Sequence, residues 1–149
     1  MSISKEKKVN TVFIGYDPKE KVAAQVLKYL IEANSPKDII VKFLRKDILE
    51  HMNMFNRPFE WENGQMIDSI DKKPFSTEFT FTRFLVPALM QYEGWALFMD
   101  CDMYPRTDVN EIFEEYNDEF YPLYCVKHEY EPTDKFKMDG REQTRYNRK

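Results

Sequence analysis

Residues 95–102 read Trp-Ala-Leu-Phe-Met-Asp-Cys-Asp, and this stretch decides which fold we expect. Its first part, from Trp95 to Met99, is an unbroken apolar run of strand length, which is typical of a strand covered on both faces. We therefore expect it to be the central strand of a sheet. Asp100 and Asp102 follow at once, so two carboxylates stand at the carboxyl end of that strand.

The amino-terminal part of the chain predicts parallel strands. The run from Val9 to Ile14 is rich in β-branched residues and ends at Gly15. Asp17 is placed to cap a helix that has Pro18 in its first position, and apolar residues then recur at helical spacing. These are Val22, Ala23, Val26, Leu27, Leu30 and Ile31. Residues 39–44 supply a second strand, and a strand, helix, strand unit predicts an α/β fold with a parallel sheet.

The middle of the chain is less regular. Residues 50–75 lose any period, which predicts a long loop that is functional or contains short elements. We expect its His51, Phe59 and Trp61 to pack onto the core rather than to wall a pocket. Ser76 and Thr77 can cap a helix with an apolar face, and Pro87 should kink that helix or end its regular hydrogen bonding.

Two further elements are expected towards the carboxyl end. Asp108 and Glu111 form a capping pair for a short helix that follows the central strand. Residues 121–126 look like another strand despite their proline. Cys101 and Cys125 stand near the ends of expected strands, without the spacing of metal ligands, so we expect two reduced, buried thiols.

The composition narrows the class of protein. With 149 residues, 42% of them hydrophobic, the chain predicts a single globular domain over residues 1–149, with residues 1–8 and 128–149 flexible. A net charge of −4 and a pI near 5.3 argue against a nucleic-acid partner. The polar start of the chain is followed by too short an apolar run for a signal or a membrane span, so we expect a cytoplasmic protein.

Polar side chains follow two of the expected strands. Tyr16 and Asp17 come after the first strand, and Asp100 and Asp102 after the apolar run. In open α/β sheets, ligands bind outside the carboxyl ends of the strands. Two carboxylates two residues apart can share one hard cation, Mn²⁺ or Mg²⁺. However, eleven aspartates in the chain make roughly one such spacing expected by chance, and the pair can instead be a solvated strand end.

Three segments, in this order and spacing, resemble glycosyltransferase family 8 and its GT-A-fold relatives. They are Phe13-Ile14-Gly15-Tyr16-Asp17, then residues 76–87, which read Ser-Thr-Glu-Phe-Thr-Phe-Thr-Arg-Phe-Leu-Val-Pro, and residues 95–103 with the short helix behind them. The resemblance spans about Val9 to Val126. It implies a GT-A-like, Rossmann-like fold, with a mostly parallel sheet flanked by helices.

The resemblance also implies a site and an activity. Tyr16 and Asp17 would lie against the base and ribose of a nucleotide, and Arg83 would face the diphosphate or donor sugar. Asp100 would approach the ribose and the metal, and Asp102 would bind the metal directly. The implied activity is metal-dependent transfer from a nucleotide-diphospho-sugar, a UDP-sugar, to an unknown acceptor. No catalytic base is assigned. Without that function, Asp17 is only a helix cap, Tyr16 a turn aromatic and Arg83 a solvated helix residue.

One departure from the family leaves other functions open. Its members continue beyond this length, with acceptor-side strands and a downstream histidine that completes the metal site. We therefore expect a fold truncated at its carboxyl-terminal side, whose exposed sheet edge can pair two copies. The alternatives are a nucleotide-sugar-binding module without catalysis, an interaction domain in which Asp100 and Asp102 are caps, and, more weakly, a metal-dependent phosphatase.

Overall fold

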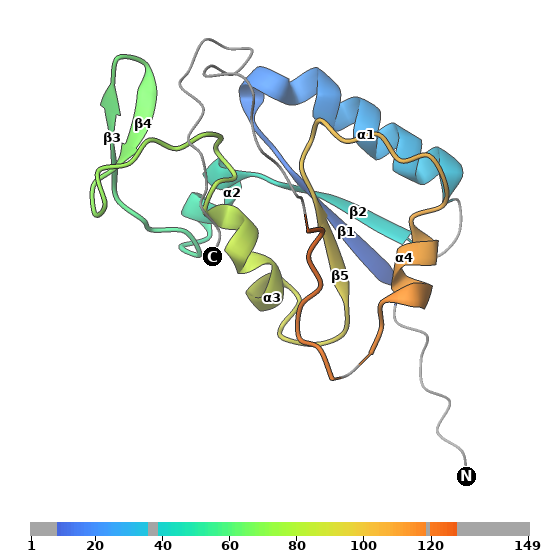
Figure 1. Ribbon diagram of the computed structural model, residues 1–149. Coiled ribbons are helices and arrows are strands. Elements are labelled where there is room, and N and C mark those ends of the chain that lie inside the picture. Colours follow the sequence, from blue (N-terminus) through green and yellow to red (C-terminus); the bar gives the residue numbers. More distant parts are fainter. Residues whose placement is uncertain (1–8, 36–38, 119, 128–149) are drawn as a thin grey trace. The chain divides into compact units, whose positions relative to one another are not determined.

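A computed structural model describes residues 9–35, 39–118 and 120–127 (Figure 1). The chain forms two units, residues 1–117 and residues 118–149, each described by itself. All the helices and strands of the described residues belong to the first unit. In chain order they are β1 (Asn10–Gly15), a 3₁₀ turn (Pro18–Glu20), α1 (Lys21–Asn34), β2 (Ile39–Leu44), α2 (Lys46–His51), β3 (Phe59–Glu62), β4 (Gln65–Asp68), a second 3₁₀ turn (Thr82–Leu85), α3 (Val86–Leu89), β5 (Ala96–Met99) and α4 (Asn110–Glu115).

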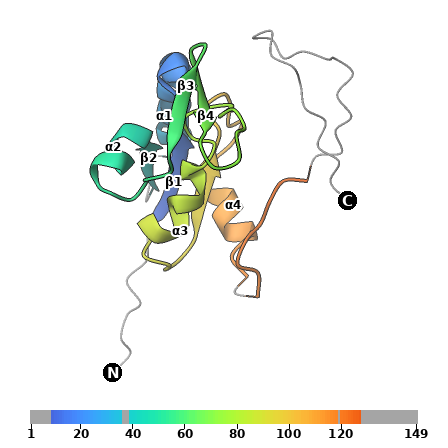
Figure 2. The same ribbon diagram turned by 90° about the vertical axis from the view of Figure 1, so that its left-hand side faces the viewer.

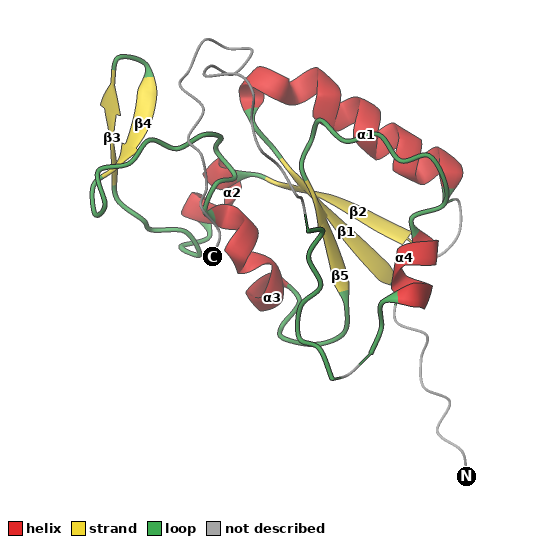
Figure 3. Cartoon of the chain, viewed as in Figure 1, coloured by secondary structure: helices red, strands yellow, loops and turns green. Residues whose placement is uncertain are grey.

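Three parallel strands make the main sheet, in the order β2-β1-β5 (Figures 1 and 3). The α/β class and the parallel pairing are confirmed, but the central strand is β1 and not the apolar run at 95–99. β1 is buried from Thr11 to Gly15, whereas Ala96, Leu97 and Phe98 are only half-buried. An apolar run indicates burial, but it does not show on how many sides a strand is paired.

Helices cover both faces of this sheet, as Figures 1 and 2 show. On one face, Val12 and Ile14 of β1 pack against α1 and α4. On the other face, Phe13 packs against Leu49 of α2 and Val86 of α3. Alternate residues of one strand therefore serve two cores, which is what a strand buried on both faces requires.

The start of α1 follows the expected cap. Asp17 accepts a hydrogen bond at its Oδ1 from the Lys19 backbone N–H (2.9 Å), and Pro18 opens the turn. The first turn is 3₁₀, and the α-helix begins at Lys21. The expected apolar face is confirmed in part, because Leu27 and Ile31 are buried together with Ala24, whereas Val22 and Val26 are exposed.

The irregular stretch at 50–75 contains a short hairpin, β3 paired with antiparallel β4. Buried Asp68 anchors the hairpin by accepting hydrogen bonds from the Arg57 side chain and from the backbone N–H groups of Ile70 and Asp71. Phe59 stacks against Phe75, as expected for a residue packed on the core. The same expectation was wrong for Trp61 and His51, because Trp61 is 63% exposed and His51 is also exposed.

No regular helix starts at Ser76 or Thr77, so that prediction was wrong. The Thr80 hydroxyl accepts a hydrogen bond from the Thr77 backbone N–H (3.0 Å) and donates one to the Thr77 carbonyl (2.8 Å), and this local closure competes with helix formation. Pro87 does not kink a helix but occupies the first turn of α3, where its missing N–H is not needed.

The described residues of the second unit, Asp118 and 120–127, contain neither a helix nor a strand. The strand expected at 121–126 is therefore absent. Cys125 is exposed, which corrects the expectation of a buried thiol, while Cys101 is buried and reduced as expected. The expected flexibility of residues 1–8 and 128–149 concerns residues outside the described ones. No helix in the described part of the chain has the length and apolarity needed to cross a membrane.

Candidate functional site

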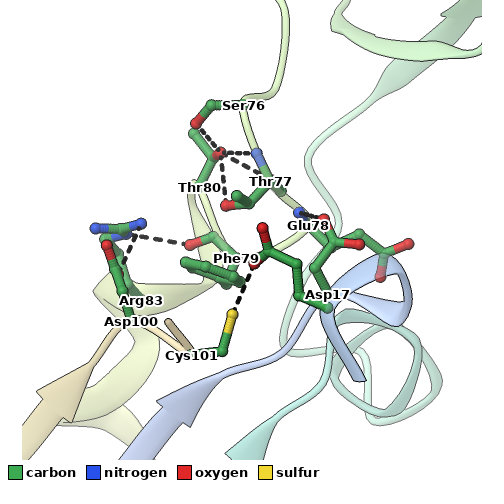
Figure 4. Close-up of polar contacts among 10 residues, drawn as sticks. Asp17, Ser76, Thr77, Glu78, Phe79, Thr80, Arg83, Asp100 and Cys101 are labelled. Carbon is green, nitrogen blue, oxygen red and sulfur yellow. Dashed lines mark hydrogen bonds and ion pairs between the residues drawn. The ribbon is translucent and has the colours of Figure 1, made fainter. Parts of the chain in front are cut away.

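The candidate site is formed at the carboxyl ends of the parallel strands by three segments: residues 16–20 after β1, residues 100–102 after β5, and residues 76–83. Side-chain contacts connect all three (Figure 4). Asp17 binds the 76–83 segment, Arg83 of that segment pairs with Asp100, and Cys101 binds Glu20. These contacts include three of the five residues that the sequence predicted, Asp17, Arg83 and Asp100, and Asp102 lies on the same segment as Asp100.

Asp17, one of the predicted site residues, has a structural role. It is 8% exposed, and while its Oδ1 caps the turn at Lys19, its Oδ2 accepts a hydrogen bond from the Glu78 backbone N–H (3.2 Å). Both carboxylate oxygens are therefore engaged by backbone donors. The consequence is that Asp17 fixes the 76–83 segment to the end of β1.

Phe79 makes a second connection between the same segments. Its ring is 2% exposed and lies so close to Gly15 that a Cβ atom at Gly15 would come within 2.6 Å of it. Only glycine leaves room for this ring at the end of β1. Neither residue type nor spacing predicts such a contact, because it joins positions far apart in the sequence.

Arg83 reaches from this segment to the end of β5. Its Nε donates to the Phe79 carbonyl (3.2 Å), and its NH2 lies 3.4 Å from Asp100 Oδ1. The guanidinium also lies over the rings of Phe79 and Phe98, at 5.3 Å and 5.0 Å from their centroids. These contacts orient Arg83 along the carboxyl edge.

The side chain of Asp100 is 40% exposed, but one of its carboxylate oxygens is buried. Its Oδ1 is buried and has no hydrogen-bond donor, since Arg83 approaches it only as an ion pair. Burial raises the pKa of Asp100 above its ordinary value, with a further rise from the negative charge of Asp102 and an opposing effect from Arg83. A carboxylate in this state gains from an additional cation.

Asp102 and Cys101 face different surroundings. Asp102 is exposed, close enough to Asp100 to affect its pKa. Cys101 is 1% exposed and donates from its Sγ to Glu20 Oε2 (2.8 Å), and burial together with this bond raises the pKa of the thiol to about 12. Among the residues that the structure describes, no group of three or more His, Cys, Asp or Glu is arranged to hold a metal ion. The aspartate pair supplies two hard oxygen ligands.

Tyr16 lies at the same edge but between other side chains. Its half-buried ring is 5.5 Å from that of Phe43, and the Arg45 guanidinium carbon is 5.5 Å from the Tyr16 centroid. The sequence reasoning missed Arg45 and Lys46, although they follow β2 directly. The rule that singled out the residues after the other two strands applies equally to them.

Lys46 and Glu78 are two further charged residues near this edge. Lys46 is 7% exposed, and its Nζ lies 2.9 Å from Glu50 and 4.5 Å from the Phe59 ring centroid. Burial raises the pKa of Glu78, an effect that the charge of Lys46 opposes. No sequence signal marked Glu78, because its partial burial depends on the fold of its segment.

A cavity of about 490 Å³ lies at the other end of the strands. Its walls come from the residues that begin β1, β2 and β5 and from the ends of α3 and α4, and they include Val9, Ile40, Trp95 and Phe113. None of the predicted site residues lines this cavity. The carboxyl edge is therefore separate from the hollow at the amino edge.

Comparison with known proteins finds the chain similar to a plant protein. The chain is 38% identical over 146 residues to Protein CDI of Arabidopsis thaliana, an alignment that covers 98% of this chain and 51% of that protein. The chain thus spans about half the length of the curated relative that it matches. No family model matches the chain, and no solved structure matches it.

Proposed function

We propose that this chain binds a nucleotide-diphospho-sugar together with a divalent cation and transfers the sugar to a hydroxyl acceptor, as a GT-A-like glycosyltransferase. The observation that carries the proposal is the pair formed by Arg83 and Asp100. The planar, permanently charged guanidinium of Arg83 lies next to the carboxylate of Asp100, whose buried Oδ1 has no hydrogen bond. The negative charge of a diphosphate is complementary to Arg83, and the positive charge of a divalent cation is complementary to Asp100.

The residues fit a hard cation. Asp100 and Asp102 offer carboxylate oxygens, which Mn²⁺ and Mg²⁺ prefer, and the buried Oδ1 of Asp100 has no hydrogen-bond partner that a cation would displace. When bound, the cation would supply neutralising charge to the departing diphosphate. Arg83, held by the Phe79 carbonyl, would orient the diphosphate from the other side.

In the transfer, the bond between the anomeric carbon and the diphosphate oxygen breaks, and the diphosphate leaves with the electron pair. A bond to the acceptor oxygen forms, and the acceptor proton passes to a base that we do not assign. Asp17 would act mainly by holding the 76–83 segment, because both of its oxygens already accept backbone hydrogen bonds. A UDP-sugar remains the proposed donor, on the family resemblance.

A second candidate keeps the donor site and omits the transfer. It is favoured by the length of the chain, which covers 51% of Protein CDI, so that an acceptor site can depend on segments or partners beyond these residues. A second copy, added at the exposed edge of the sheet, is one such partner. This candidate predicts the same nucleotide and metal binding without any release of sugar.

Thermal unfolding tests both candidates. UDP, GDP and ADP are each added with and without Mn²⁺, and with Mg²⁺ in place of Mn²⁺. A ligand at about a hundred times its Kd stabilises the folded state by about 2.7 kcal/mol, which raises the Tm of a chain of this size by roughly 5–10 °C. The proposal expects a shift that needs both UDP and the cation. Incubation with UDP-sugars, followed by measurement of released UDP, separates transfer from binding alone.

Matched variants locate the site. Asp102→Asn should abolish the cation-dependent shift, whereas Glu114→Gln removes one negative charge from an exposed position on α4 and should leave the shift intact. If no nucleotide raises the Tm of the wild-type chain under any condition, the donor site does not exist. The chain would then be an interaction domain with capped strand ends.

A further inference from the structure

A stack of planar side chains ends at the carboxyl edge beside the candidate donor site. β1 and β2 pair in register with Gly15 opposite Leu44, so Tyr16 and Arg45 follow at the same level of the edge. The ring centroids of Phe43 and Tyr16 lie 5.5 Å apart with their planes inclined at 53°, and the Arg45 guanidinium carbon lies 5.5 Å from the Tyr16 centroid. The stack is therefore a series of inclined contacts in the order Phe43, Tyr16, Arg45.

The guanidinium of Arg45 is held in one orientation. Its Nε and NH2 donate to the two carboxylate oxygens of Asp47, at 3.1 Å and 2.5 Å, which fixes the plane of the group. Asp47 lies in the first turn of α2, directly after Arg45, so this geometry is local to the sequence Arg45-Lys46-Asp47. The side chain of Arg45 remains 43% exposed. One planar group at the end of the stack thus stays accessible.

We propose that the base of the donor nucleotide stacks on the Arg45 guanidinium, with Tyr16 as the layer behind it and Asp47 as a positioning residue. This inference rests on the proposed function and deepens it, because it assigns the base to a residue that follows β2. Guanidinium planes stack on nucleobases, and every base offers a π-face for such a contact. Arg45 donates two hydrogen bonds to Asp47, whereas Arg83 approaches Asp100 with one nitrogen at 3.4 Å and would orient the diphosphate.

Charge alone does not account for this arrangement. An arginine that served only to attract phosphate would not need its guanidinium hydrogen-bonded to a neighbouring carboxylate or placed over an aromatic ring. The stack predicts that planarity matters and that a lysine at the same position does not substitute. It also predicts that the contribution of Arg45 depends on the base being present in the ligand.

Ligand truncation tests the inference. Affinities for UDP and for inorganic pyrophosphate are measured by titration calorimetry, with the cation that gives the larger UDP shift, for wild type, Arg45→Ala and Arg45→Lys. Loss of a stacked base contact weakens UDP by about fivefold or more. Both variants should show that loss, while their pyrophosphate affinity stays within about twofold of wild type. Lys42→Ala is the matched control, because it removes one positive charge from β2, where the Lys42 Nζ lies over the Phe13 ring of the neighbouring strand β1.

The other outcomes overturn the inference in distinguishable ways. If Arg45→Ala weakens UDP and pyrophosphate equally and Arg45→Lys restores both, Arg45 acts as a charge on the diphosphate. If neither variant changes UDP affinity, the base lies elsewhere. If wild type binds pyrophosphate with the cation but not UDP, the base contact is refuted while the diphosphate site survives. If wild type binds neither ligand, the proposed function itself fails. Circular dichroism and the Tm without ligand establish that each variant is folded.

Discussion

The two ends of the same parallel sheet differ in chemistry. At the carboxyl ends of the strands, charged side chains connect three loops, and Asp17, Arg83 and Asp100 each bind a segment other than their own. At the amino ends, a cavity of about 490 Å³ is lined largely by apolar residues such as Val9, Ile40 and Phe113. One end carries connected charged side chains, and the other carries a mainly apolar cavity.

This difference shows that a cavity in a fold does not by itself mark the functional site. A concave apolar pocket is the usual first candidate for a ligand site. Here the cavity is lined by none of the five residues that the sequence predicted for the site, whereas all five lie at the carboxyl edge. The direction of the strands, rather than cavity volume, therefore identifies the candidate site.

The largest expected effect comes from removing a buried phenylalanine at each end of the sheet. Phe79 at the carboxyl edge is 2% exposed and Phe113 at the amino edge is 9% exposed. Replacing either by alanine should lower the free energy of unfolding by about 3–5 kcal/mol, measured by urea denaturation. Only Phe79→Ala should also remove the cation-dependent UDP shift, because only Phe79 holds the 76–83 segment against Gly15.

Phe84→Ala serves as the control for this pair. Phe84 follows Arg83 directly but is 75% exposed, so its replacement should change stability by no more than about 0.5 kcal/mol. Equal loss of UDP binding in Phe79→Ala and Phe113→Ala, at temperatures where both are folded, would contradict the separation of the two ends.

A smaller effect is expected from Arg83→Gln, which removes the internal cation from the carboxyl edge. Asp100 then has no competing guanidinium, so the cation alone should bind about fivefold more tightly. UDP with the cation should bind about tenfold more weakly, because the charged donor to the diphosphate is lost. Fluorescence titration with Mn²⁺ and calorimetry with UDP measure the two changes. The opposite signs are the test, and Arg106→Gln, at an exposed position, should move neither affinity.

How much of the fold could be predicted from the sequence depended on how far apart in the sequence the contacting residues lie. Asp17 and Pro18 act on the turn that they begin, and the strand at 39–44 has the predicted bounds, because local patterns determine them. The order of strands was harder, since the apolar run at 95–99 gave no sign that β1 would lie between it and β2. The expected helix from Ser76 failed because Thr80 closes a turn through its hydroxyl.

The candidate site shows the same limit. The sequence marked Asp100, Asp102, Asp17, Tyr16 and Arg83 from motif position and resemblance, without showing what each would touch. Phe79 filling the space above Gly15 is a tertiary contact that no spacing rule contains. Arg45 directly follows a correctly predicted strand, but its contact with Tyr16 joins two strand ends and is not visible in the sequence.

The smallest effect, a shift with pH, sharpens the comparison because it concerns one carboxyl group at the polar end. Burial raises the pKa of Asp100, so over the interval between its ordinary and its raised pKa the folded chain keeps a proton that the unfolded chain has lost. Stability therefore falls as pH rises through this interval, and cation affinity rises, because the cation competes with that proton.

Mn²⁺ affinity measured across the acid range should decline at a higher pH than it would for a pair of aspartates with ordinary pKa values. In Arg83→Gln the decline should move to still higher pH, since the guanidinium opposes the rise. A decline that stays at the pH of an ordinary aspartate would mean that Asp100 is hydrated in solution, and that its buried oxygen does not depend on the cation for compensation.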